Sequence, residues 1–209
     1  MNKALDIVKN NKKIVILAIS LSVFIFLLIN VLSDNISDFD TSIYNVIVSL
    51  KSDFMTFIMK AITRFGDAET LILIAIICLI FIKSKKISGS IAINLASVGL
   101  MNYILKKIIQ RPRPPLEFRM VEESSFSFPS GHAMASMAFY GLIIYFINKN
   151  MKNNKLKKVI CIILSILIFL IGMSRIYLGV HYASDVIAGF AISMVYLILY
   201  ITYIIKIME

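Results

Sequence analysis

The sequence contains two histidines, and the residues around each of them could take part in phosphate chemistry. His132 ends the string Pro129-Ser130-Gly131-His132, directly before an apolar run. Ser130 is a favourable N-cap, and Gly131 lets a ligand approach the backbone. Because the free N–H groups and the dipole of a helix N-terminus attract anions, the string predicts an anion site, although an ordinary capped helix start explains it equally well.

The second histidine belongs to the pattern Ser174-Arg175-x5-His181-x3-Asp185. If a helix begins near His181, Asp185 lies four residues further on and shares its face. A carboxylate there can accept a hydrogen bond from one ring nitrogen and leave the other nitrogen free to attack. The alternative is a His–Asp capping pair, which gives no purpose to Arg175, since an arginine at the end of a membrane span needs only to reach the interface.

The third element is Lys106-x6-Arg113-Pro114, which follows an uncharged apolar run. Arginine suits phosphate because its planar guanidinium binds two oxygens at once, and lysine adds a point charge. The alternative is an ordinary basic loop. We interpret the other cations nearby as no more than such a loop: Lys107, Arg111 and Arg119.

The composition indicates a membrane protein. Of the 209 residues 59% are hydrophobic, and the mean hydropathy is +0.86. Uncharged apolar runs of about 20 residues match the thickness of a bilayer core. We therefore predict an all-α fold, a polytopic membrane helical bundle with six transmembrane helices at 14–32, 70–82, 87–105, 133–148, 159–173 and 186–205. The length favours a single membrane domain over 1–209, with the candidate site carried by a core at 71–205.

The first apolar run, 14–32, could be a signal peptide. It is longer than a signal core, however, and no small-x-small cleavage site follows it, so we expect it to remain as a span. Between the first two runs, apolar residues of segment 39–64 recur at helical spacing among polar ones. This pattern predicts one or two amphipathic helices at the membrane surface, which we interpret as serving packing only.

The charge distribution predicts the orientation in the membrane. If the N-terminus is cytoplasmic, 13 of the 22 basic residues and two of the twelve acids fall on the inner side. The inner segments then carry +11 and the outer segments −1, which explains the net charge of +10 without nucleic acid. Both termini are expected in the cytoplasm. All three candidate elements then lie together on the outer face, because each follows or precedes a span at that side.

Taken in order, the three elements resemble the motifs of the type 2 phosphatidic acid phosphatase superfamily, over roughly 71–205. In that family His181 would attack the phosphorus atom and form a phosphohistidine, oriented by Asp185. His132 would protonate the leaving oxygen and later activate water. The remaining motif residues would hold the phosphoryl oxygens: Lys106, Arg113, Ser130, the N–H of Gly131, and Arg175.

The resemblance implies neither a metal nor another cofactor. Both histidines already have roles, and the sequence shows no cluster of carboxylates. Cys78 and Cys161 lie inside apolar runs, and we interpret both as reduced packing residues.

The stretch Glu123-Ser124-Ser125-Phe126-Ser127-Phe128 is similar to small bacterial members of the family. We therefore expect a membrane phosphatase acting on undecaprenyl pyrophosphate, phosphatidylglycerol phosphate or phosphatidic acid. One rival is a transferase or a phosphatase for soluble phosphate esters. Another is a membrane transporter or scaffold that binds phospholipid without hydrolysis, although transporters tend to keep their charges near the bilayer midplane and these predicted spans are uncharged there.

Overall fold

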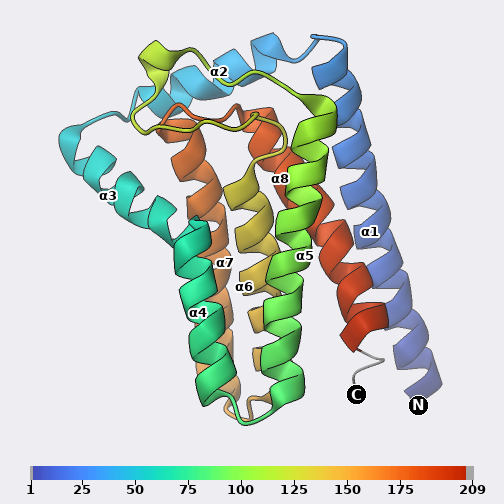
Figure 1. The fold of residues 1–209 in the computed structure, drawn as a ribbon. Coiled ribbons are helices and arrows are strands. Elements are labelled where there is room, and N and C mark those ends of the chain that lie inside the picture. The colour runs from blue at the N-terminus through green and yellow to red at the C-terminus, as the bar shows by residue number, and fades with distance from the viewer. Residues whose placement is uncertain (1, 206–209) are drawn as a thin grey trace.

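The computed structural model describes residues 2–205, and the side chains of residues 11–205, as a bundle of helices (Figure 1). No strand occurs in this part of the chain, which confirms the predicted all-α class. The helices that run along the bundle are α1 (Asn2–Leu32), α4 (Ala68–Phe81), α5 (Lys85–Ile109), α6 (Gly131–Asn150), α7 (Asn154–Tyr177) and α8 (Ala183–Leu199), which continues as a π-helical segment over Tyr200–Ile205.

Within residues 2–205, four segments are long and apolar enough to cross a membrane: Asn11–Leu32, Lys85–Ile109, Asn154–Tyr177 and Ala183–Ile205. They correspond to the first, third, fifth and sixth predicted spans. The other two predicted spans are also helical, but α4 has only 14 residues, and polar residues at both ends of α6 lower its hydropathy. Six transmembrane helices therefore stay a prediction.

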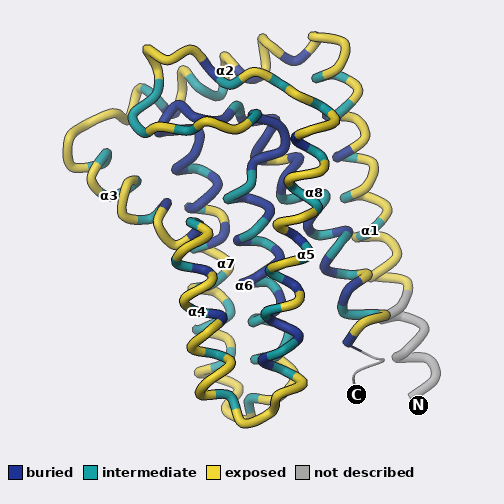
Figure 2. Tube along the Cα trace, in the orientation of Figure 1, coloured by how far each residue is buried: buried dark blue, intermediate teal, exposed yellow. Residues whose placement is uncertain are grey.

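The centre of the bundle is α6, which contacts α5, α7 and α8, while α1 packs on α8 and α4 packs on α5. Met134, Phe139 and Leu142 of α6 are fully buried. Figure 2 shows the buried residues gathered on the inner helices and the exposed ones on the outer faces. Those outer faces expose large apolar side chains such as Phe26 and Phe81, a pattern that suits contact with lipid.

The region 39–64, predicted to hold one or two helices, contains most of α2 (Ser37–Val48) and all of α3 (Asp53–Thr63). Ser52 caps α3, because its side chain accepts a hydrogen bond from the N–H of Met55 at 3.2 Å. Short 3₁₀ turns follow at Arg64–Gly66 and, further on, at Leu116–Phe118. Helix α2 lies across one end of the bundle, called the upper end here, and α3 leads from it to α4 (Figure 1).

The connection between α5 and α6 also runs over the upper end (Figure 1). Helix α5 stops before Arg111-Pro112-Arg113-Pro114, because proline lacks the N–H that a helix interior requires. The connection is fixed to the turn between α7 and α8 by the N–H of Met120, which donates to the carbonyl of Leu178 at 2.9 Å. Gly179, with φ at 70°, leaves no room for a side chain beside the Phe118 carbonyl.

Candidate active site

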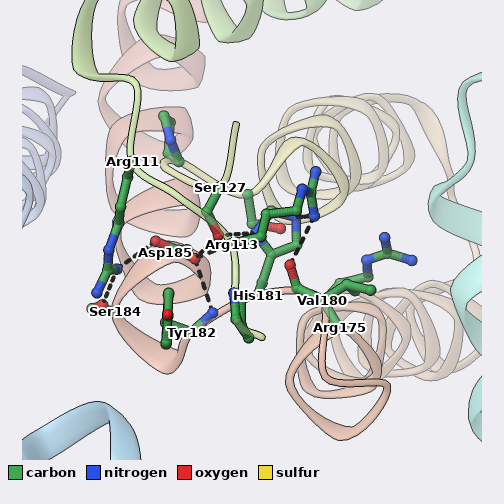
Figure 3. Close-up of polar contacts among 12 residues, drawn as sticks. Arg111, Arg113, Ser127, Arg175, Val180, His181, Tyr182, Ser184 and Asp185 are labelled. Atoms are coloured by element: carbon green, nitrogen blue, oxygen red, sulfur yellow. Dashed lines mark hydrogen bonds and ion pairs between the residues drawn. The ribbon is translucent and has the colours of Figure 1, made fainter. Parts of the chain in front are cut away.

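The three elements picked out in the sequence meet at the upper end of the bundle. Figure 3 shows Arg113 of one element beside Arg175, His181 and Asp185 of another. Lys106 lies near the C-terminal end of α5, His132 in the first turn of α6, and Arg175 near the end of α7. Direct contacts join the elements to one another. The N–H of Ser130 donates to the carbonyl of Asp185 at 3.0 Å, and Nη1 of Arg113 lies 3.1 Å from Nε2 of His181.

His181 is enclosed, with its side chain 1% exposed. Its Nδ1 lies 3.4 Å from Oδ2 of Asp185, four residues further on, as the predicted spacing required. Its Nε2 faces the guanidinium of Arg113, which can only donate hydrogen bonds. Nε2 must therefore carry the lone pair, and the ring proton sits on Nδ1 beside the carboxylate. Burial, followed by the charge of Arg113, lowers the pKa of His181 well below its usual value, so the imidazole is neutral at neutral pH.

Asp185 is fully buried, and both of its oxygens accept hydrogen bonds. Oδ1 accepts from Nη1 of Arg111 at 2.6 Å, while Oδ2 accepts from Oγ of Ser127 at 2.6 Å and from the N–H of Tyr182 at 2.9 Å. The bond from Tyr182 caps the start of α8, so the capping interpretation describes part of what Asp185 does. The same carboxylate also lies beside His181, and its orientation is fixed by these donors (Figure 3).

The cations predicted to hold phosphate are all buried or nearly so. Nζ of Lys106 donates to Oγ of Ser125 at 3.1 Å and to the carbonyl of Phe126. Nε of Arg113 donates to the carbonyl of Ser125 at 2.6 Å. Nη1 of Arg175 donates to Oγ1 of Thr63 at 2.7 Å. These contacts fix three cationic groups near His181, and each of the three charges opposes protonation of its ring.

Glu123 lies between Arg113 and Arg175 and was not predicted to be a site residue. One of its carboxylate oxygens pairs with Nη2 of Arg175, and the other lies 3.3 Å from Nη2 of Arg113. The buried Nε of Arg175 has no hydrogen-bond partner among the described residues. A carboxylate thus occupies the place between two guanidinium groups that would suit a phosphoryl group, and one donor there is still unused.

The string around His132 folds as its residues predict. Ser130 is the N-cap of α6, and its side chain accepts from the N–H of Ala133. A Cβ at Gly131 would lie 3.1 Å from Oδ1 of Asn102, so the glycine also allows α5 to approach closely. Nδ2 of Asn102 donates to the carbonyl of Pro129 at 3.1 Å. The first turn of α6 is therefore held against α5 as well as against the first turn of α8.

His132 has a carboxylate partner that the motifs did not reveal. Its Nε2 lies 2.7 Å from Oδ1 of Asp67, which is the N-cap residue of α4 but does not use its side chain as a cap. The hydrogen bond to His132 lowers the pKa of Asp67, while burial lowers the pKa of His132 against the opposing effect of Asp67. In the sequence Asp67 had an ordinary explanation as an N-cap. In the structure Gly66 lets His132 approach this segment, because a Cβ at Gly66 would lie 2.8 Å from Cδ2 of His132.

The interpretation of Arg111 as a loop cation is wrong. Its guanidinium bridges two buried carboxylates, Asp185 at 2.6 Å and Asp40 of α2 at 2.8 Å. The interpretation of α2 as a packing helix was also too narrow, because Asp40 brings a charge from that helix into the site. By contrast, Arg119 donates to the carbonyl of Pro114 and Lys107 lies over the ring of Tyr103, which suits the loop interpretation.

An apolar cavity of about 560 Å³ lies between α4 and α5 and reaches the site. Its walls come from small and aliphatic residues such as Ala75, Leu95 and Gly99, and it is lined at its polar end by Gly131 and His132. Its shape and chemistry fit a hydrocarbon chain whose head group lies at His132. Among the described side chains, no group of three His, Cys, Asp or Glu residues is placed to hold a metal ion.

Comparison with known proteins supports the resemblance. The family model described as "PAP2 superfamily" matches residues 88–209. The chain is 35% identical over 181 residues to phosphatidylglycerophosphatase B of Bacillus subtilis (strain 168), covering 84% of this chain and 89% of that protein. It is 26% identical over 160 residues to undecaprenyl-diphosphatase of Sulfolobus acidocaldarius, covering 74% and 71% of the two chains.

A solved structure is similar over nearly the whole chain. The crystal structure of a transmembrane PAP2 type phosphatidylglycerolphosphate phosphatase from Bacillus subtilis superposes with a TM-score of 0.79 at 31% sequence identity. The match covers 90% of this chain and 96% of that one. The likeness therefore extends well into the segment before residue 88, where the family match begins.

Proposed function

This chain belongs to the PAP2 superfamily, and from that membership we propose that it removes phosphate from a membrane lipid through a covalent phosphohistidine. The single observation that carries the proposal is the orientation of His181. Its Nε2 bears a lone pair and faces Arg113, and its Nδ1 proton is directed to a buried carboxylate. This is the arrangement that a nucleophilic imidazole requires.

In the first step, Nε2 of His181 attacks the phosphorus atom and forms a P–N bond as the P–O bond to the lipid breaks. His132 donates a proton to the leaving oxygen. Asp185 stabilises the positive charge that develops on the ring of His181. The phosphoryl group takes the place of the Glu123 carboxylate, and its oxygens accept hydrogen bonds from the surrounding cations: Lys106, Arg113 and Arg175.

In the second step, His132 accepts a proton from a water molecule, and the water oxygen attacks the phosphohistidine. The P–N bond breaks, inorganic phosphate leaves, and His181 returns to its neutral form. The two histidines must therefore hold opposite protonation states when the lipid binds. Burial lowers the pKa of both imidazoles; Asp67 opposes this lowering at His132, whereas Arg113 adds to it at His181, so protonation is easier at His132.

The apolar cavity between α4 and α5 favours a lipid over a soluble phosphate ester. A hydrocarbon chain lying there would place its phosphate next to His132 and the first turn of α6. Phosphatidylglycerol phosphate is the first candidate, since the relative that is 35% identical is a phosphatidylglycerophosphatase. Undecaprenyl pyrophosphate is the second, supported by the more distant undecaprenyl-diphosphatase, and phosphatidic acid is the third.

We place the site at the outer face of a cell membrane crossed six times. The lysine-rich connections, between α4 and α5 and between α6 and α7, lie at the end of the bundle opposite α2 (Figure 1). The positive-inside rule then puts that end in the cytoplasm. To test this orientation, a cysteine or lysine is added in either connection and cells are treated with a thiol or amine reagent that does not cross the membrane. Labelling of the added residue only after the cells are opened would support this orientation. Labelling of intact cells would contradict it.

The experiment that tests the function is a substrate panel on the purified protein in detergent. Phosphate release is measured from phosphatidylglycerol phosphate, undecaprenyl pyrophosphate, phosphatidic acid and the soluble ester p-nitrophenyl phosphate. We expect release from at least one lipid, at a kcat/KM well above that for the soluble ester, and none from His181→Ala. Lipid binding without release would instead favour a transporter or scaffold.

Catalysis without a metal is part of the proposal. Three fixed cations supply the charge that a metal would otherwise bring to the phosphoryl oxygens: Lys106, Arg113 and Arg175. We expect activity to survive EDTA. Complete loss in EDTA that magnesium restores would contradict this part of the proposal.

A further inference from the structure

Asp40 is a buried carboxylate on a helix that the motifs do not include. Its side chain is 2% exposed, although α2 as a whole lies at the surface of the bundle. Oδ1 accepts from the N–H of Ser184 at 2.8 Å, and Oδ2 accepts from Oγ of Ser184 at 2.7 Å and from Nη2 of Arg111 at 2.8 Å. Asp40 thus contacts both the neighbour of Asp185 in sequence and the arginine that binds Asp185.

Arg111 is held on several sides at once. Nη2 pairs with Asp40, and Nη1 donates to Oγ of Ser184 at 2.8 Å and to Oδ1 of Asp185 at 2.6 Å. The guanidinium also lies over the ring of Tyr182, 4.2 Å from its centroid. Lysine could supply the charge but not this planar set of contacts. Figure 3 shows Arg111 on the far side of Asp185 from His181.

We propose that Asp40 and Arg111 are positioning residues for the nucleophile, acting through Asp185, so that helix α2 forms part of the active site. The proposal rests on the proposed function. Arg111 fixes Oδ1 of Asp185, which leaves Oδ2 turned towards His181. Asp40 in turn fixes Arg111. Without Arg111, Oδ1 of Asp185 loses its charged donor, and only Ser127 and the N–H of Tyr182 still hold the carboxylate, both at Oδ2. Without Asp40, Arg111 itself is less firmly placed. Either change loosens the carboxylate that orients the His181 ring.

The charges of the cluster support a role in catalysis rather than in stability alone. A buried ion pair is weak evidence for stability, because removing the charges from water costs about as much as their attraction returns. Two carboxylates around one guanidinium leave the cluster with one net negative charge behind His181. That charge stabilises the imidazole as it becomes positive on bonding to phosphorus.

Asp40→Asn tests the proposal, and Asp38→Asn is its matched control. Both residues are acids of α2, but Asp38 is exposed. We expect Asp40→Asn to lower kcat for the best lipid substrate by roughly 10- to 100-fold, as expected for residues that orient a catalytic group. The KM and the inhibition constant of inorganic phosphate should change less than about twofold, because other residues bind the phosphoryl group. Asp38→Asn should match the wild type.

Arg111→Lys provides a second variant, and the thermal unfolding temperature in detergent shows whether each variant folds. Arg111→Lys keeps the positive charge but loses the planar contacts of the guanidinium, so kcat should again fall while KM stays unchanged. The double variant with Asp40→Asn should lower kcat little more than the more damaging single change does, since both residues act through Asp185. If Asp40→Asn does not fold, the same kcat-against-KM comparison is made on Arg111→Lys alone.

Three results would overturn the proposal. If Asp40→Asn or Arg111→Lys folds and has the same kcat as Asp38→Asn, the cluster does not position the nucleophile. Equal changes in kcat and in the phosphate inhibition constant would show a general disturbance of the site. If the wild type and Asp38→Asn are both inactive on every lipid phosphate, the proposed function is refuted, and this inference with it.

Discussion

The two imidazole–carboxylate pairs of the site have different surroundings. His181 and Asp185 are 1% and 0% exposed, lie four residues apart and are enclosed by cations and backbone. His132 and Asp67 are 16% and 42% exposed and come from parts of the chain 65 residues apart. The enclosed pair suits formation of a bond to phosphorus away from water. The open pair, beside the apolar cavity, suits proton exchange with a leaving group and with water.

The largest expected effect separates the two histidines. His181→Ala removes the attacking nitrogen and should lower phosphate release by on the order of 10⁴-fold or more, with no labelled intermediate. His132→Ala removes only the proton donor and should lower phosphate release by about 10²- to 10³-fold. The measurement is phosphoenzyme formed from ³²P-labelled lipid and trapped in base, where phosphohistidine survives.

Formation of a ³²P-labelled phosphoenzyme by His132→Ala would further separate the roles of the two histidines, because the first step can proceed slowly without a proton donor. Equal labelling of wild type and His181→Ala would overturn the assignment of His181 as the nucleophile.

An intermediate effect is expected at Asp67, and it should depend on pH. The Asp67 carboxylate raises the pKa of His132 against the effect of burial, so Asp67→Asn should lower the pKa of His132 further. A general acid acts in its protonated form, and the alkaline limb of the kcat profile should therefore move to lower pH. The decrease in kcat should reach about 10²-fold at alkaline pH, which is the usual contribution of a general acid, and should be small at acidic pH.

Asp185→Asn is the companion variant for that profile. Asp185 orients His181, which is already neutral over this range, so its loss should lower kcat at all pH values alike. A parallel drop for Asp67→Asn, without movement of the alkaline limb, would show that Asp67 does not tune His132.

The smallest expected effect concerns the cavity beside His132. Gly99 lines it, and a Cβ at that position meets no atom within 4 Å. Gly99→Phe should narrow the cavity and raise the KM for a diacyl phosphate by roughly tenfold, with no change for p-nitrophenyl phosphate. Gly89→Phe is the control, since Gly89 lies on the same helix with equally open space but outside the cavity. Equal effects of the two variants would place the lipid elsewhere.

Local patterns in the chain predicted much of the fold and part of the site. Apolar runs gave the positions of the helices along the bundle, because burial in lipid or protein follows periodicity and length. The pairing of His181 with Asp185 followed from their spacing on one helix face. The meeting of the three motif elements at one end followed from alternation of the spans, since successive helices run in opposite directions.

Contacts between distant segments could not be predicted in this way. Asp40 lies 71 residues before Arg111, and Asp67 lies 65 residues before His132. Each acid had an ordinary local explanation, as a charge on a surface helix or as an N-cap. Nothing in the residues next to Glu123 indicated that its carboxylate would lie between Arg113 and Arg175.

The amino-acid order therefore indicated which groups are proposed to do the chemistry: two imidazoles, an orienting carboxylate and three cations, each in or near the end of a helix. The packing of α2, α4 and the α5–α6 connection over the upper end decided which carboxylate each group meets. The reason is physical. Helix periodicity and capping act over a few residues, whereas the partner of a buried charge depends on how whole helices are placed, and that is set by the bundle as a unit.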